Sequence, residues 1–392
     1  MLRWKRFVQG DEDLWLANTR KFTELTGVPV RVDSENFEDV RPKAAVAANV
    51  GSGPDIVYGW FDDPHLYVDK VLDVTDLADY LGAKYGGWYD VVNRYCTHQG
   101  RWIAIAMGIL GGCVTYRRSM IEAAGYQSIP TDFPNYLRLL QALKAKSKPC
   151  GFALGNAVGD ANAWCYWVVW AHGAKMVDEN NKVMINSKET LAALDYAKAM
   201  YGTFIEGTLS WLDPNNNKAF LAGDISLTLN GISIYYAAKK SPDPRMRALA
   251  EDIYHAPLPV GPVGRSTELS LFSPGFIFKF TKYPNAAKEY VRFMMEKDQY
   301  EAWQAASIGY VAQPLKAYRS NPVWTSDPKH TPFRDIPERT LDDGYAGTLG
   351  PASAGVMADY VMVNMVAEAA SGATSAQTAA RRAERRARRY YS

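Results

Sequence analysis

The sequence predicts an α/β protein in which helices cover a mainly parallel sheet. Within the first 60 residues, short apolar runs alternate with amphipathic segments of helical length, a pattern typical of parallel sheets. The alternation continues along the 392 residues, with no internal repeat, low-complexity linker or clean boundary near the middle. Because a chain of this length can form two domains, we expect two interwoven α/β lobes.

Each early element has its own local signal. Val28, Val30 and Val32 alternate as in a half-buried strand, and the first helix has acidic residues at its start and Gly27 at its expected end. The expected elements, in chain order, are strand 2–8, helix 11–27, strand 28–33, helix 38–53 and strand 54–59. Ligands bind beyond the carboxyl ends of parallel strands. The stretch from Gly59 to Asp63, which follows the third strand, is therefore expected at a binding edge.

Later segments continue the pattern. Two apolar strands within residues 100–117 are joined through glycines and lead into a helix that ends at Gly125. Residues 151–163 form a polar loop before an aromatic-rich segment, and residues 224–229 form a strand that ends in a loop at Asn230 and Gly231. Further helices are expected at 129–146, 186–202 and 285–305.

Composition excludes several classes of protein. Lys and Arg number 44 against 42 Asp and Glu, a net charge of +2 that gives no general field for nucleic acid. Six arginines lie between Arg381 and Arg389 among alanines, which indicates a docked terminal helix with exposed guanidinium groups. No apolar run reaches the roughly 18 residues of a membrane span. The amino-terminal residues do not resemble a signal peptide, so we expect either a cytosolic protein or a mature exported one.

Catalytic and metal motifs are absent from the sequence. No phosphate-binding loop, dinucleotide fingerprint, HExxH or GxSxG is found. The five histidines have no partner at metal-binding spacing, so we expect no metal, no cofactor and no enzyme activity. The abundant carboxylates leave a glycosidase pair open. The four cysteines match no metal pattern; one or two disulfides are open, and we expect at least two buried thiols.

The order of several segments is more specific than any single motif. "FTELTGVPVRVD", "GSGPDIVYG", "CVTYRRSMIEAAGY" and "FLAGDISLTLNG" follow one another, and "APLPVGPVGR" and "IGYVAQPLKAY" come later. This order resembles the extracellular solute-binding proteins of ABC importers, in the carbohydrate-binding family related to maltose- and glycerol-phosphate-binding proteins. The resemblance covers nearly the whole chain.

The resemblance implies the periplasmic-binding-protein fold, with two lobes that close over a ligand cleft by hinge motion. Carried onto this chain, it places one lobe at 1–107 plus 275–311 and the other at 112–270 plus 314–392. The crossings would lie near 108–111, 271–274 and 312–313. It implies a periplasmic, monomeric receptor that delivers a small sugar or polyol to an ABC permease and its ATPase.

The candidate ligand-binding residues are rim acids, amides and aromatic rings. Asp62 matches the position where the maltose-binding relative has a sugar-binding acid, and a carboxylate accepts two sugar hydroxyls. Trp60 can stack on a sugar ring, whereas Ser233 replaces an aromatic platform of that relative and favours a smaller ligand. The full set is Gln9, Asp11, Glu38, Trp60, Asp62, Asn156, Asp160, Asn162, Trp164, Asn230, Phe272, Tyr310 and Tyr345.

Each candidate also has an ordinary structural explanation. Loop acids cap helices, and Asn, Asp and Gly are favoured by turns alone. Other functions stay open as well: a receptor for an anionic sugar, with Arg94, Arg101 or Arg265 as anion ligands, a polyamine receptor that uses several acids, a carbohydrate hydrolase, and a cytosolic interaction protein. We expect no nucleic-acid partner.

Overall fold

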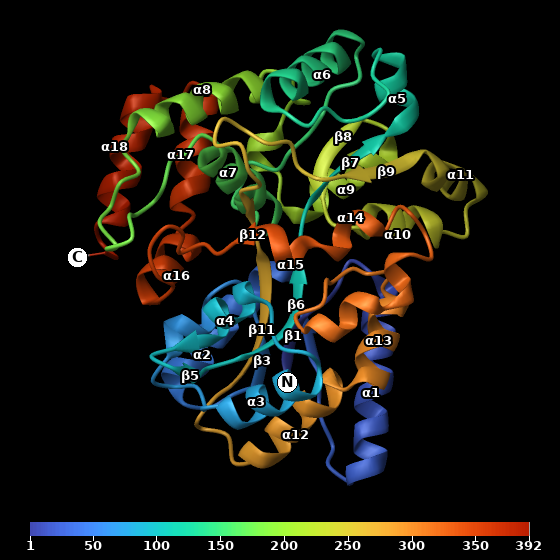
Figure 1. The fold of residues 1–392 in the computed structure, drawn as a ribbon, viewed down its shortest axis with the longest axis vertical. Helices are drawn as coiled ribbons and strands as arrows, with labels where there is room; N and C mark the ends of the chain where they lie inside the picture. Colours follow the sequence, from blue (N-terminus) through green and yellow to red (C-terminus); the bar gives the residue numbers. More distant parts are fainter. Residues whose placement is uncertain (392) are drawn as a thin grey trace. The chain divides into compact units, whose positions relative to one another are not determined.

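The computed structural model describes residues 1–391, which form two compact units (Figure 1). Unit 1 comprises Met1–Leu110, Ser270–Glu338 and Leu349–Ala354. Unit 2 comprises Gly111–Leu269, Arg339–Thr348 and the chain from Gly355 onward. Residues 314–338, which the sequence analysis assigned to the second lobe, thus pack within unit 1.

Unit 1 is built on a five-stranded sheet in the order β2-β1-β3-β11-β6. The strands are β1 (Leu2–Trp4), β2 (Asp33–Glu35), β3 (Ile56–Tyr58), β6 (Ile105–Leu110) and β11 (Leu271–Ile277). β1 pairs in parallel with β2 and β3, and β11 pairs antiparallel with β3 and β6. The expected strand at 28–33 is wrong: those valines precede β2, which begins only at Asp33, because Leu2–Trp4 pair with Asp33–Glu35.

The helices of unit 1 cover this sheet. They are α1 (Gln9–Thr26), α2 (Val40–Val50), α3 (Thr75–Lys84), α4 (Asp90–Cys96), α12 (Pro284–Met295), α13 (Lys297–Ala306) and α14 (Thr331–Arg334), with 3₁₀ turns η1 (Phe37–Asp39), η2 (Asp63–Tyr67), η4 (Lys316–Ser320) and η5 (Pro322–Trp324). A short hairpin joins β4 (Thr97–His98) and β5 (Arg101–Trp102). The predicted cap at Gly27 is confirmed, with φ 72°. The single helix expected at 285–305 is two helices, because Glu296 has an extended backbone.

Unit 2 has a three-stranded sheet in the order β8-β7-β9, formed by β7 (Cys113–Arg117), β8 (Leu227–Asn230) and β9 (Ile253–Ala256). Both neighbours run antiparallel to β7, so the expected parallel arrangement is wrong for this unit. The helices are α5 (Arg118–Ala123), α6 (Phe133–Ala145), α7 (Asp160–Ala171), α8 (Lys188–Tyr201), α9 (Asp213–Ala222), α10 (Ser233–Lys239), α11 (Pro244–Asp252), α17 (Val361–Ala370) and α18 (Ala376–Ala387), with the turn η3 (Thr208–Ser210).

Four short elements complete the described chain. β10 (Glu268–Leu269) pairs in parallel with β12 (Thr340–Leu341). The boundary between the units falls within α15 (Ile336–Arg339) and within α16 (Pro351–Ala358). No helix in the described chain is both long and apolar enough to cross a bilayer.

All four cysteines are buried free thiols. Burial raises the pKa of Cys113 and of Cys150 to about 12, so these thiols stay protonated at neutral pH. The structure therefore has no disulfide among residues 1–391, and the expectation of buried thiols holds for all four.

Candidate functional site

The segment after β3 forms a tight turn at the carboxyl end of the parallel strands in unit 1. Gly59 has no room for a side chain, since a Cβ there would lie 2.9 Å from Asp63 Oδ2. Phe61 adopts a positive φ of 44°, which is uncommon for a bulky residue and is found at functional sites. The turn therefore holds the two following carboxylates in fixed positions.

The two adjacent acids of this turn have different partners. Asp63 accepts hydrogen bonds from Arg41 Nε at 2.6 Å and from the Trp60 amide at 3.0 Å, which close the turn on itself. Burial raises the pKa of Asp63 against the opposing effect of Arg41. Asp62 is fully buried and accepts a hydrogen bond of 2.6 Å from Ser353 Oγ. Asp63 thus stabilises the turn, whereas Asp62 binds a serine from a distant part of the chain.

Aromatic rings surround an arginine at the same edge of the sheet. The Trp60 ring lies 4.9 Å from the Trp4 ring, and the Tyr310 ring lies 6.0 Å from Trp4. The Arg6 guanidinium lies 4.7 Å from the Trp4 ring centre and 5.9 Å from those of Trp60 and Tyr310. Cation–π attraction stabilises such an arrangement. Trp4, Arg6, Trp60, Tyr310 and Asp11 are called the unit 1 cluster below.

Asp11 supplies the negative charge of the unit 1 cluster. Its carboxylate accepts a hydrogen bond from Arg3, and its Oδ1 lies 3.5 Å from Arg6 Nε. Glu12 adds a second carboxylate 3.8 Å from Arg3, so the two cations face two anions. Within residues 1–391, Arg6 Nε and Nη1 and Asp11 Oδ2 are buried without a hydrogen-bond partner. Donors and an acceptor are thus available side by side among aromatic rings.

The other predicted residues of unit 1 lie outside this cluster. Gln9 is exposed and donates to Asp13 Oδ1 at 2.7 Å. Glu38 is half-buried in η1. Phe272 is fully buried, with its ring stacked on Tyr95 at 4.4 Å. These three residues stay predictions that no contact with the cluster supports.

Unit 2 contains a polar network at the start of two helices. Asp160 is the first residue of α7, and Asp213 is the first of α9. Asp213 Oδ1 accepts hydrogen bonds from the amides of Gly159 and Asp160 at 3.0 and 2.7 Å. Asn216 Nδ2 donates to Asp160 Oδ2 at 2.6 Å. Burial and the neighbouring Asp213 raise the pKa of Asp160 well above its usual value.

The network continues to the end of β8. Asn216 also donates to the Leu229 carbonyl at 3.2 Å. Asn230 donates to Asn217 Oδ1, and Asn217 donates to Ser233 Oγ at 2.9 Å. Two predicted residues, Asp160 and Asn230, therefore belong to one hydrogen-bonded group in unit 2.

The remaining candidates of unit 2 are dispersed. Asn156 is exposed. Asn162 and Trp164 lie within α7, not in the expected loop: Asn162 donates to the Val158 carbonyl at 3.0 Å, and buried Trp164 donates to the Ala153 carbonyl at 2.6 Å. Tyr345 accepts a hydrogen bond of 2.8 Å from Arg265. Trp164 is enclosed by the core, so its ring is accounted for by packing.

Sequence reasoning missed several members of these groups. Arg3 and Arg6 lie in a stretch read as a continuous strand, yet β1 ends at Trp4. Asn216 and Asn217 follow Asp213 in "DPNNN". This segment indicates the start of a helix, but nothing in it indicates a polar network. Charged residues within an apolar amino-terminal strand were the one available sign of the cluster in unit 1.

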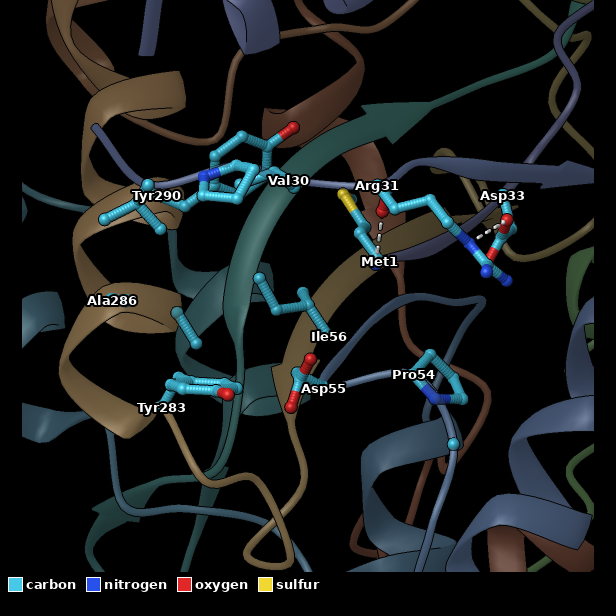
Figure 2. A pocket seen from close by; sticks show the side chains of 14 residues that line it. Met1, Val30, Arg31, Asp33, Pro54, Asp55, Ile56, Tyr283, Ala286 and Tyr290 are labelled. Carbon is cyan, nitrogen blue, oxygen red and sulfur yellow. Dashed lines mark hydrogen bonds and ion pairs between the residues drawn. The ribbon is translucent and has the colours of Figure 1, made fainter. Parts of the chain in front are cut away.

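A separate pocket lies at the opposite edge of the unit 1 sheet (Figure 2). Its volume is about 550 Å³, and it lies beside the amino ends of β1, β2 and β3. The Met1 amine donates to the Arg31 carbonyl at 2.7 Å, and Arg31 pairs with Asp33 at 2.9 Å. The Asp55 carboxylate, also drawn there, accepts a hydrogen bond from Thr281 at 2.6 Å. The pocket is away from the carboxyl edge where the candidate residues meet. No group of acids, histidines or cysteines suited to a metal occurs among the described residues.

Comparison of the sequence with models of known families identifies the class of this protein. The model of the bacterial extracellular solute-binding protein family matches residues 18–332. The chain therefore belongs to this family, whose members act in transport outside the cytoplasm.

Individual relatives are distant in sequence and close in fold. The Escherichia coli K12 protein YcjN, named as a periplasmic-binding protein of an ABC transporter, is 21% identical over 327 residues, which cover 81% of this chain and 71% of that protein. Maltose-bound MalE3 of T. maritima is 18% identical, with a TM-score of 0.84 over 99% of this chain and 98% of that one. A ribitol-bound solute-binding protein of Agrobacterium radiobacter K84 is 17% identical, with a TM-score of 0.78 over 99% and 97%. These structures support the expected periplasmic-binding-protein fold.

Proposed function

We propose that the protein is the solute receptor of an ABC importer and that it binds a small sugar or polyol. The unit 1 cluster carries this proposal. A sugar offers hydroxyl groups that both donate and accept, and apolar C–H faces. Arg6 has hydrogen-bond donors, Asp11 has an acceptor and Trp60 has an aromatic ring, and all three side chains are buried together at this edge of the sheet.

The charge of the cluster favours an uncharged ligand. Arg3 and Arg6 are balanced by Asp11 and Glu12, so a phosphate or a polyamine would leave one charge without a counterion. An unpaired buried charge is strongly unfavourable. A hydroxyl group can bridge the donor of Arg6 and the acceptor of Asp11 without this penalty.

The polar network of unit 2 is the second group that we propose to bind ligand. Asp160 and Asn230 are joined there through amides that can exchange hydrogen bonds with hydroxyls. Distant relatives hold maltose and ribitol, which agrees with a ligand of this class. We further propose a periplasmic monomer that delivers its ligand to a membrane permease, by ligand-dependent closure and without catalysis.

Thermal unfolding with a panel of ligands tests the proposal. The panel includes monosaccharides, disaccharides, polyols, sugar phosphates, polyamines and a chromogenic glycoside. A ligand at a hundredfold excess over its dissociation constant stabilises the folded state by about 2.7 kcal/mol, a rise of roughly 5–10 °C in Tm for a unit of this size. A shift with neutral sugars or polyols supports the proposal, whereas shifts with only phosphates or polyamines, or cleavage of the glycoside, would refute it.

The adjacent acids of the turn provide a matched pair of variants. In Asp62→Asn the shift produced by the ligand should fall, because the negative charge that strengthens hydrogen bonds from ligand hydroxyls is lost. In Asp63→Asn the unliganded protein should be less stable, since the ion pair between Asp63 and Arg41 is lost, but the ligand should still produce its shift. Equal ligand shifts in both variants would show that Asp62 does not contact the ligand. The unit 1 cluster would then be tested with Arg6→Gln and Asp11→Asn, which should each reduce the ligand shift.

A further inference from the structure

Helix α18 of unit 2 exposes a row of arginines that the proposed ligand site does not use. The helix begins after Ser375, whose side chain accepts a hydrogen bond of 3.2 Å from the Thr378 amide. Its buried residues are Ala379, Ala380, Ala383 and Ala387. This alanine face packs on α17 and α8, which lie beside α18 in Figure 1. The opposite face therefore points away from the packed helices.

Three arginines of the segment are used by the fold. Arg382 pairs with Glu368 at 3.0 Å, Arg386 with Asp359 at 3.0 Å, and Arg388 with Glu384 at 2.8 Å. The first two hold α18 to its neighbours. These contacts account for half of the six arginines between residues 381 and 389.

The other three form what we call the arginine row: Arg381, Arg385 and Arg389. All three are exposed and make no ion pair in the described part of the chain. Residues four apart share one face of a helix, so Arg381 and Arg385 are aligned, and Arg389 follows in the turn after the helix. At 1.5 Å per residue the row is about 12 Å long.

We propose that the arginine row is a docking surface for anionic phospholipid headgroups of a membrane. An exposed row of positive charges fits a flat layer of phosphates. A single small anion would instead need donors that converge on one point. The apolar residues of α18 are buried against the protein, so the helix can adsorb on the bilayer surface but cannot insert into it. Tyr390, which is 37% exposed, adds a side chain that favours the membrane interface.

The charge distribution along the chain agrees with this partner. Residues 381–389 carry six arginines and one glutamate, a net charge of +5, and subtracting this from the total of +2 leaves −3 for the remainder. Binding through the arginine row would orient the receptor on a negative surface, since the rest of the chain is repelled from it. An extracellular receptor that supplies a permease works beside such a surface, whatever ligand it carries.

Vesicle sedimentation tests the proposal directly with the full chain. Vesicles of phosphatidylglycerol and phosphatidylcholine should bind the protein at low salt, and vesicles of phosphatidylcholine alone should not. Each basic residue near an anionic membrane contributes a factor of about five in affinity. The triple variant Arg381→Gln, Arg385→Gln and Arg389→Gln should therefore bind roughly 100-fold more weakly. Raising the ionic strength to 0.5 M should release the wild-type protein.

A second triple variant controls for net charge. Arg20→Gln, Lys21→Gln and Lys146→Gln remove the same three charges from exposed positions outside α18 and should leave vesicle binding within about twofold of wild type. Replacing the arginine row with lysines should also preserve binding, because point charges suffice.

Three outcomes would overturn the proposal: equal losses in the two glutamine variants, binding to neutral vesicles, and no vesicle binding at all. Binding of duplex DNA that depends on the row, in place of vesicle binding, would assign it to nucleic acid instead. The thermal stability of each variant shows whether the fold is intact, and none of these results depends on the sugar proposed above.

Discussion

His65 gives unit 1 a pH-dependent stability that can be measured. Its side chain is 1% exposed, and Nε2 donates to the Tyr95 carbonyl at 3.0 Å. Burial lowers the pKa of His65 from 6.5 to about 4, with a smaller contribution of the same sign from His98. The folded state thus favours the neutral ring, and its stabilisation is present above pH 6.5 and is lost as the pH falls toward 4.

The expected size follows from this shift. A displacement of about 2.5 pKa units corresponds to about 3 kcal/mol in full, of which about 2 kcal/mol is lost between pH 7 and pH 5. The substitution His65→Gln retains a donor for the Tyr95 carbonyl but does not titrate. The difference in unfolding free energy between wild type and variant should therefore fall by about 2 kcal/mol over this range.

Urea denaturation at several pH values measures this difference. Tryptophan fluorescence reports on the unfolding of both units, since each contains tryptophans, and the NMR chemical shift of the His65 ring gives its pKa independently. A difference that stays constant from pH 7 to pH 5, or a ring that titrates near 6.5, would refute the reasoning. An exposed residue such as Gln127, substituted by Glu, serves as a control for surface charge.

Two further predictions concern unit 2 and the packing of unit 1. Asp160→Asn should become increasingly stabilising relative to wild type as the pH rises above 4, by up to about 1.4 kcal/mol per pH unit. The reason is that the raised pKa of Asp160 makes its ionisation unfavourable in the folded state. A difference in unfolding free energy that does not change with pH in urea denaturation would contradict this. Gly309→Ala should cost roughly 2–4 kcal/mol, since Gly309 has φ +76° and a Cβ there would lie 2.4 Å from Trp324. Gly223 has φ +86° but a Cβ there would have nothing within 4 Å, so Gly223→Ala should cost only about 1–2 kcal/mol. Equal losses of stability in the two alanine variants, measured by thermal unfolding, would show that the contact with Trp324 contributes nothing.

The sequence predicted the elements better than their pairing. Gly27 terminates α1 as expected, because a left-handed cap is a local property of glycine. The alternating valines at 28–32 gave an equally clear strand signal, but the strand that pairs with β1 starts at Asp33. The choice of register depends on the partner strand and on the packed face, which a local pattern does not contain.

The candidate site shows the same limit. Asp62 was identified from the resemblance to the maltose-binding relative, and Asp11 was among the candidate acids. Their partners were not identified. Ser353 lies 291 residues away from Asp62, and Arg3 lies in the stretch that was read as a continuous strand. The rings of Trp60 and Trp164 looked equivalent in the sequence. Tertiary packing buries both rings, and only the structure shows that Trp60 lies beside Arg6 whereas Trp164 packs against Phe152.

The hydrogen bond between Asp62 and Ser353 also bears on how the chain is made. Unit 1 requires residues from Met1–Leu110, from Ser270–Glu338 and from Leu349–Ala354. While the ribosome is still synthesising the chain, the turn at Asp62 therefore lacks one of its contacts until Ser353 has emerged. Such long sequence separations slow folding. A nascent chain of this design stays incompletely folded for most of its synthesis, the condition in which a polypeptide can be threaded through a secretion channel.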